Sequence, residues 1–178
     1  MNFLENKYMR LRAPEPEDLD LLYRWENNTS VWTAGITLTP YSRDILKKYL
    51  ATAHQDIFEN KQLRLMIDIR KGKRYKTIGT IDLFDFDPHN QRAGVGILIA
   101  DVSERKKGYA SMAVNMMIKY CFSVMGIHQL YCNIEAGNTI SIKLFEKAGF
   151  KKTGVKKEWL RRGDKWTDEL MYQLINPE

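Results

Sequence analysis

The pattern of apolar and polar residues predicts four strands in the first hundred residues. Apolar and basic side chains alternate in residues 8–12, as they do in a half-buried strand. Longer strand-like runs occupy residues 64–70, 77–86 and 91–100. The connections between these three runs are short and contain turn-forming residues, so we expect an antiparallel meander.

Four helical segments are predicted from apolar residues that recur every three to four positions. Residues 14–28 begin with prolines and carboxylates, which favour the first turn of a helix. Residues 39–58 predict a second helix or a helical hairpin. Residues 108–126 predict a long amphipathic helix, and residues 138–150 predict a shorter one that ends at Gly149.

The remaining segments complete a mixed sheet. Residues 128–136 predict a fifth strand, and residues 155–175 predict two more strands around the turn RRGDK. A helix joins the fourth and fifth strands, so these two should be parallel, whereas their neighbours should be antiparallel. The sequence therefore predicts an α/β (α+β) fold, with residues 1–178 forming a single domain.

Composition agrees with one globular domain. The chain has 178 residues, of which 44% are hydrophobic, and it contains no linker-like stretch. Its formal net charge of +6 would attract polyanions modestly, and an ordinary basic surface explains the charge equally well. The N-terminus has no apolar signal region and no apolar run is long enough to cross a membrane, so we expect a soluble, cytoplasmic protein.

The residues that most often bind metals form no cluster in the sequence. Cys121 and Cys132 fall on the long helix and the fifth strand, where we expect buried free thiols, and no metal is expected. The histidines match no motif and are expected to be surface or structural residues: His54, His89 and His128. The tryptophans are expected in the core or in pocket walls: Trp25, Trp32, Trp159 and Trp166.

One loop is a candidate binding site for a diphosphate. The sequence ERKKGYA (104–110) follows the strand-like run VGILIA and leads into the long predicted helix. The first amides of a helix have no partner within the helix, and the helix dipole favours an anion there. Gly108 permits close approach of a ligand, and three cations precede it. A basic, solvent-exposed loop is the alternative interpretation.

This loop and a second motif resemble those of a known enzyme family. RKKGYA is similar to the Arg/Gln-x-x-Gly-x-Gly/Ala signature of the GNAT superfamily of acetyl-CoA-dependent N-acetyltransferases, and NTISIKLFEKAGF resembles its second motif. The segments RLRAPEPEDLDLLYRWENN and GVKKEWLRRGDKWTDELMYQL resemble the branch that holds ribosomal-protein N-terminal acetyltransferases and spermidine acetyltransferases. The resemblance implies the GNAT fold, a mostly antiparallel sheet splayed between strands 4 and 5 and flanked by about four helices.

The resemblance also implies where acetyl-CoA would lie. Its pantetheine arm would bond to the main chain of the splayed sheet, and its pyrophosphate would rest on the amides of the glycine loop. Asn138 would hold the pantetheine end and Lys143 would meet the adenosine phosphate, although Lys143 is more simply an exposed helix cation. The implied coenzyme-binding residues are Ile97, Ile99, Arg105, Lys106, Lys107, Gly108, Tyr109, Ala110, Asn138 and Lys143.

Acetyl transfer to an amine needs a base, a donor to the developing oxyanion and an acid for the departing thiolate. Many GNAT enzymes use a tyrosine of the second motif as the acid, but Phe145 stands at that position. Ser141 matches the serine of the ribosomal-protein branch and Glu158 matches a glutamate of the same branch, so the resemblance implies Ser141 as the acid and Glu158 as the base. A backbone N–H near Ile99 is expected as the oxyanion donor. A helix-capping Ser141 and an ordinary exposed Glu158 are the alternatives.

The acceptor is less constrained by the sequence. We expect direct attack by a primary amine in a ternary complex, with a protein N-terminus of the ribosomal-protein type as acceptor and a polyamine or other small amine as the alternative. The expected acceptor pocket contains Glu26, Asp82, Glu135, Trp159 and Asp168. Two non-enzymatic alternatives are a nucleic-acid or ribosome-binding module and an acetyl-CoA sensor. Dimerisation through the last strands fits the branch, and no membrane partner is expected. No nucleic-acid partner is expected either, because no extended run of basic residues interleaved with aromatic residues is evident.

Overall fold

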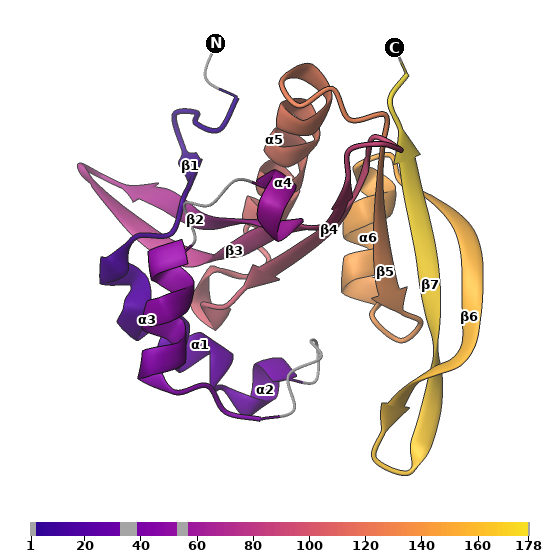
Figure 1. The fold of residues 1–178 in the computed structure, drawn as a ribbon, viewed down its shortest axis with the longest axis horizontal. Coiled ribbons are helices and arrows are strands. Elements are labelled where there is room, and N and C mark those ends of the chain that lie inside the picture. The colour runs from indigo at the N-terminus through magenta and orange to yellow at the C-terminus, as the bar shows by residue number, and fades with distance from the viewer. Residues whose placement is uncertain (1–2, 33–38, 53–56, 178) are drawn as a thin grey trace.

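The computed structural model describes residues 3–32, 39–52 and 57–177, with the backbone alone for residues 30 and 31. Its strands form a seven-stranded sheet in the order β1-β2-β3-β4-β5-β7-β6 (Figure 1). The strands are β1 Met9–Arg12, β2 Leu63–Lys71, β3 Arg74–Asp87, β4 Arg92–Ile99, β5 Gln129–Glu135, β6 Lys151–Arg162 and β7 Lys165–Ile175. The meander of β2, β3 and β4 is antiparallel and β4 is parallel to β5, which confirms the predicted mixed sheet.

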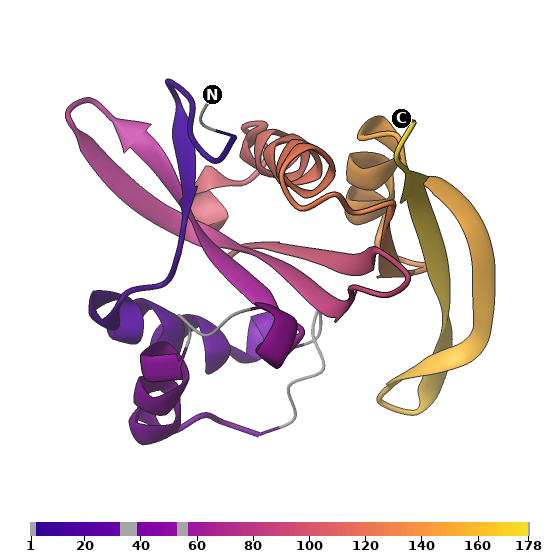
Figure 2. The same ribbon diagram turned by 45° about the horizontal axis from the view of Figure 1, so that its top comes forward.

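Helices cover both faces of the sheet, with α5 and α6 on one face and α1 and α3 on the other (Figure 2). The helices are η1 Pro16–Asp18, α1 Leu19–Glu26, α2 Thr29–Trp32, α3 Arg43–Thr52, α4 Ile57–Asn60, η2 Val102–Glu104, α5 Tyr109–Ser123 and α6 Thr139–Lys147. Within the described residues four of them have at least eight residues, which agrees with the expected number. The short elements α2 and η2 were not predicted, because a single turn leaves no periodic pattern to detect.

Two apolar clusters join the helices to the sheet. On one face Leu22 of α1 and Leu46 of α3 cover Met66 of β2. On the other face Val114 and Met117 of α5 belong to the larger cluster that includes the opposite side chains of the sheet. Burying one such side chain contributes about 2 kcal/mol to folding. The sheet is therefore held rigidly between its two helical layers.

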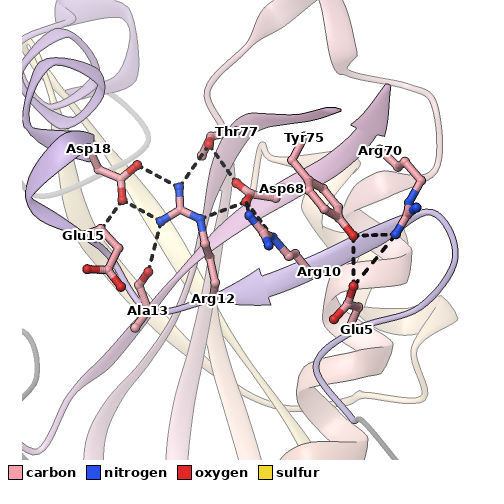
Figure 3. Close-up of polar contacts among 10 residues, drawn as sticks. All are labelled: Glu5, Arg10, Arg12, Ala13, Glu15, Asp18, Asp68, Arg70, Tyr75 and Thr77. Atoms are coloured by element: carbon pink, nitrogen blue, oxygen red, sulfur yellow. Dashed lines mark hydrogen bonds and ion pairs between the residues drawn. The ribbon is translucent and has the colours of Figure 1, made fainter. Parts of the chain in front are cut away.

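A charged network ties the start of the chain to the sheet (Figure 3). Arg12 of β1 donates two hydrogen bonds to the carboxylate of Asp18, at 2.7 and 2.8 Å, and a third, from Nε, to Asp68 Oδ2 at 2.8 Å. Asp18 and Asp68 are 3% and 1% exposed. Burial alone raises the pKa of Asp18, but the bonds from Arg12 and from the Glu15 amide together lower it below its usual value. The network fixes η1, and with it α1, against β1 and β2.

Several expectations about single residues can now be compared with the structure. Cys121 and Cys132 are buried free thiols, as predicted, and burial raises the pKa of each to about 12. Trp159 and Trp166 are 59% and 57% exposed, so they do not fill the core, and a place in a pocket wall stays a prediction for these two. The reason is that they lie on the β6–β7 hairpin, whose outer strand β6 is an edge of the sheet.

The other expectations concern histidines and the membrane. His89 and His128 are exposed, as expected, and His54 lies outside the described residues. Among the described helices none is both long and apolar enough to span a membrane.

Candidate active site

The parallel strands β4 and β5 separate soon after they begin. Their pairing extends only from Arg92–Gln129 to Gly94–Tyr131. Over Gly94, Phe84 of β3 packs edge to face against Tyr131 of β5, with the ring centroids 5.8 Å apart. A Cβ on Gly94 would lie 2.2 Å from the Phe84 ring, so glycine is required for this contact. The aromatic pair therefore marks the closed end of a V-shaped opening between β4 and β5, and the splay implied by the family resemblance is present.

The main chain of β4 offers polar groups to this opening. Ala100 N–H donates to the Ile78 carbonyl at 2.9 Å, which makes this a hydrogen-bonded pair of β3 and β4. Because such pairs alternate along an antiparallel ladder, the N–H and C=O groups of Ile97 and Ile99 point away from β3. β5 does not pair with β4 beyond Gly94. The main-chain groups of Ile97 and Ile99 therefore face the opening. Their bonding to a pantetheine arm stays a prediction.

The glycine loop supplies a second set of free amides. Gly108 caps α5 in the left-handed conformation, with φ +85°, and a Cβ at this position would meet no atom within 4 Å. The first backbone bond into the helix runs from Met112 N–H to the Gly108 carbonyl, at 3.1 Å. The N–H groups of Tyr109 and Ala110 precede that bond and are free for an anion.

The three cations of the loop differ in their surroundings. Arg105 Nε donates to the Ile99 carbonyl at 2.8 Å, and Lys107 Nζ donates to Glu104 at 2.9 Å. Lys106 has a φ of +61° and forms no ion pair with any described residue. Lys107 is thus paired with a carboxylate, whereas Arg105 is held by a neutral carbonyl and keeps its full positive charge.

Glu104 organises the base of the loop, a role that sequence reasoning missed. This carboxylate is 5% exposed and forms ion pairs with Lys71, Lys76 and Lys107, at 3.2, 3.1 and 2.9 Å. Bonds from Lys107 and Lys76 lower the pKa of Glu104 to about 2. Because Lys71 and Lys76 belong to β2 and β3, the contact fastens the loop to the β2–β3 hairpin. The glutamate directly before RKKGYA was the only sequence signal for it.

The second motif forms the start of α6. The Asn138 side chain caps the helix by accepting from the Ser141 N–H at 3.1 Å, a role that the sequence analysis did not assign to Asn138. The Ser141 hydroxyl makes no hydrogen bond to the described residues. Phe145 is 3% exposed and packs edge to face on Phe150, at 5.1 Å between centroids, while Lys143 is exposed. Phe145 thus serves the core.

Two of the predicted acceptor acids converge on the face opposite α5. Arg64 of β2 donates from Nε to Asp82 Oδ1 and from Nη1 to Glu26 Oε1, both at 2.7 Å. Burial raises the pKa of Asp82, and the Arg64 charge and hydrogen bonds offset only part of that effect. The register partner of Asp82 on β4 is Gly96, which has no side chain. The Phe84 ring lies near Gly96, and otherwise the space between the Asp82 carboxylate and the opening is clear on this face of β4. Arg64 was not predicted, because its partners are distant in the sequence.

The other predicted acceptor residues lie across the opening, on β5, β6 and β7. Glu135 accepts from Arg162 Nη2 and from Thr167 Oγ1, both at 3.0 Å. Asp168 pairs with Lys157 Nζ at 2.8 Å and accepts from the Glu158 N–H at 2.9 Å. The side chain of Glu158 is exposed, its φ is +47°, and it forms no ion pair within the described chain. The structure therefore divides the predicted acids into two groups, one on each side of the cleft.

A hollow of about 560 Å³ adjoins the open end of β4 on the α1 face. Its walls are formed by α1 and the residues after it, the start of β3 and the residues after β4: Leu21, Arg24, Trp25, Asn28, Lys76, Thr77, Ala100 and Asp101. Asp101 pairs with Lys76 at 2.8 Å, and this bond lowers its pKa to about 2. The hollow gives a molecule room next to the cleft on the side away from α5.

These features are those of an acetyltransferase, and comparison with known proteins identifies the family. The model of the acetyltransferase (GNAT) domain matches residues 9–151, so the chain belongs to the GNAT acetyltransferase family. It is an acetyl-CoA-dependent N-acetyltransferase, as predicted. The first amides of α5 fit the diphosphate of that cosubstrate, and the part of β4 that does not pair with β5 fits its amides, with the Ile99 carbonyl also accepting from Arg105.

Individual relatives cover nearly the whole chain. An uncharacterized N-acetyltransferase, p20, of Bacillus licheniformis is 27% identical over 100% of this chain and 98% of the relative. The spermidine N(1)-acetyltransferase of Vibrio cholerae is 24% identical over 84% of this chain and 82% of its own. A crystal structure of spermidine N-acetyltransferase from Vibrio cholerae with CoA and spermine has a TM-score of 0.84, at 22% identity, and the match covers 96% of each chain. This structural match supports the fold.

Proposed function

We propose that this enzyme transfers the acetyl group of acetyl-CoA to a primary amine of a polyamine. The relative from Vibrio cholerae that acts on spermidine supports a polyamine over the protein N-terminus that the sequence analysis favoured. The observation that carries the proposal is the cluster of Glu26, Asp82 and Arg64 beside the splayed strands. Two carboxylates on one guanidinium leave a net negative charge, which favours a cationic acceptor.

The coenzyme would occupy the opening from the α5 and α6 side. The amides from Lys106 to Ala110 would hold the pyrophosphate, and the main chain of Ile97 and Ile99 would bond to the pantetheine arm. Bound acetyl-CoA supplies a thioester carbonyl, the electrophile that an amine attacks. The N–H of Ile99 would donate to the oxygen of that carbonyl as negative charge develops there.

The acceptor would then reach the cleft from the α1 face. Gly96 leaves this face open next to Asp82, and the hollow beyond β4 has room for the rest of a linear polyamine. An alkyl amine is mostly protonated at neutral pH, so it must lose a proton before it attacks. Asp82 would take that proton, and its raised pKa would make it a better base than an ordinary aspartate. Ser141, at the start of α6, would act as the acid.

Two alternatives from the sequence analysis are each supported by a specific observation. Glu158 stays the alternative base, since it is exposed and without an ion pair among the described residues. A protein N-terminus stays the second candidate acceptor, since Phe145 excludes the tyrosine acid and Ser141 replaces it at a motif position.

A substrate panel tests the acceptor class. Release of free CoA thiol would be followed with spermidine, spermine, butylamine and short peptides with free N-termini, each at equal concentration. We expect turnover with the two polyamines and a kcat/KM for butylamine at least about tenfold lower, because a second ammonium adds a contact to the acidic face. Turnover of peptides without turnover of polyamines would reject the polyamine assignment and select the second candidate.

A further inference from the structure

The strongest basic segment of the chain is β6 with the turn that follows it, within the β6–β7 hairpin. Residues 151–166 contain seven lysines and arginines but two carboxylates, a net charge of +5 out of the total of +6. The register of β5 with β7 ends at Glu135 and Glu169, so residues 165–167 of β7 pair with β6 alone. The tip of the hairpin projects from the sheet as a two-stranded ribbon (Figure 1).

The ribbon combines exposed tryptophans with neighbouring cations. Trp159 and Trp166 are more than half exposed. Lys156 Nζ lies 5.0 Å from the centroid of the Trp159 ring. Arg161 is the register partner of Trp166, and directly opposed side chains on adjacent strands lie on the same face of the ribbon. Each tryptophan therefore has a cation beside it, and neither ring is used by the core.

Several of these cations have no acidic partner. Lys156, Lys157 and Arg162 pair with Glu169, Asp168 and Glu135, respectively. The remaining four are exposed and form no ion pair with any residue that the structure describes: Lys151, Lys152, Arg161 and Lys165. Their charge is available to a partner.

We propose that this hairpin binds single-stranded nucleic acid. Such strands present both a phosphate for a cation and an unpaired base that stacks on an aromatic ring, and the unit of Arg161 and Trp166 offers both contacts in one place. An acidic protein partner would use the cations but gives no reason for two exposed indoles. A two-stranded ribbon is also narrow enough to lie along one strand. The sequence analysis expected no nucleic-acid partner, and it did not weigh the seven cations and two tryptophans that lie together within residues 151–166.

Binding would be measured by fluorescence anisotropy with labelled twelve-residue oligouridine and oligothymidine, with the full-length protein at 50 and 200 mM salt. We expect binding at low salt, with a slope of log K against log salt of about −3 for the four free cations. Arg161→Glu with Lys165→Glu should weaken binding at least about tenfold and reduce the slope by about half. Trp166→Ala should weaken binding about tenfold through lost stacking. Tighter binding of the oligouridine would identify RNA as the source, and tighter binding of the oligothymidine would identify DNA.

The matched control is Lys73→Glu with Lys119→Glu, which changes the net charge equally at two exposed sites away from the hairpin. Calorimetry with coenzyme A and thermal unfolding show that each variant is folded, and neither readout depends on the acceptor of acetyl transfer. Equal losses in the hairpin and control variants would show that bulk charge alone is responsible and would overturn the proposal. Tighter binding to phosphatidylcholine–phosphatidylserine vesicles than to either oligonucleotide would also overturn it, as would self-association that buries Trp159 and Trp166.

Discussion

At the scale of single residues, the site depends on how charges are paired. Asp82 and Glu26 share the guanidinium of Arg64, whereas Glu135 and Asp168 are each paired with a cation of the hairpin. Paired carboxylates have little free charge for a substrate, and the first group alone has more acids than cations. The choice of Asp82 as proton acceptor follows from this difference and from its burial.

Replacing Asp82 by asparagine tests that choice. Asp82→Asn should lower kcat/KM for the acceptor by about 100-fold or more, the usual effect of losing a general base, with little change in coenzyme affinity. In the wild type the rate should rise as pH increases through the raised pKa of Asp82, because the base must be ionised, and the variant should lose that limb of the pH profile. Steady-state kinetics between pH 5 and 9 measure both.

The matched control for this substitution is Asp164→Asn, the same chemical change in the exposed β6–β7 turn. Glu158→Gln separates the two candidate bases. If Glu158→Gln abolishes the acidic limb and Asp82→Asn does not, the base is Glu158.

At the scale of elements, the cleft arises from a strand pair that separates and a helix that begins beside it. β4 must end where the glycine loop begins, so that the main chain of the strand and the amides of α5 can face one ligand. Glu104 fastens this loop to β2 and β3 through three lysines. The proposed coenzyme site is therefore assembled from backbone groups that the sheet positions.

Gly108→Ala tests the loop. Alanine at φ +85° is strained by about 1 kcal/mol, and its methyl group would stand where a pyrophosphate approaches the amides. We expect coenzyme A affinity, measured by calorimetry, to fall at least about tenfold. Gly72→Ala is the matched control, since Gly72 also has a positive φ, +63°, and open space around it. If the two variants bind coenzyme A equally well and lose equal stability in denaturant unfolding, the proposal that this loop binds the coenzyme is wrong.

At the scale of the whole molecule, buried ion pairs hold η1, and with it α1, against the sheet. Arg12 contacts η1, β2 and β3 at once, through Asp18, Asp68 and Thr77 (Figure 3). Removing one member of such a network leaves a buried charge without its partner, which costs far more than the intact pair contributes. The arrangement of α1 over the acceptor face depends on this network.

Arg12→Met should reduce the free energy of unfolding by about 3 kcal/mol at pH 7. In the wild type the lowered pKa of Asp18 gives stability that is present above the unfolded-state pKa and is lost as pH falls. In the variant burial is no longer opposed by Arg12, so the pKa of Asp18 should rise and protonation should relieve the unpaired charge. The difference in unfolding free energy between the two proteins should therefore shrink from pH 7 to pH 4, as measured by urea denaturation. A difference that is constant with pH would show that Asp18 does not mediate the effect.

The sequence by itself determined the order of elements, the parallel pairing of β4 with β5 and the glycine turn before α5. These follow from periodicity, connection length and the conformational demands of glycine, all of which are local. It also determined the acetyltransferase family, through two motifs whose residues are contiguous. Tertiary structure alone decided that Arg64 joins Glu26 to Asp82, that Glu104 gathers three lysines and that Trp159 and Trp166 lie outside the core. The first two findings depend on contacts between residues far apart in the chain, and the third depends on which strand forms the edge of the sheet. A local sequence pattern encodes neither of these causes.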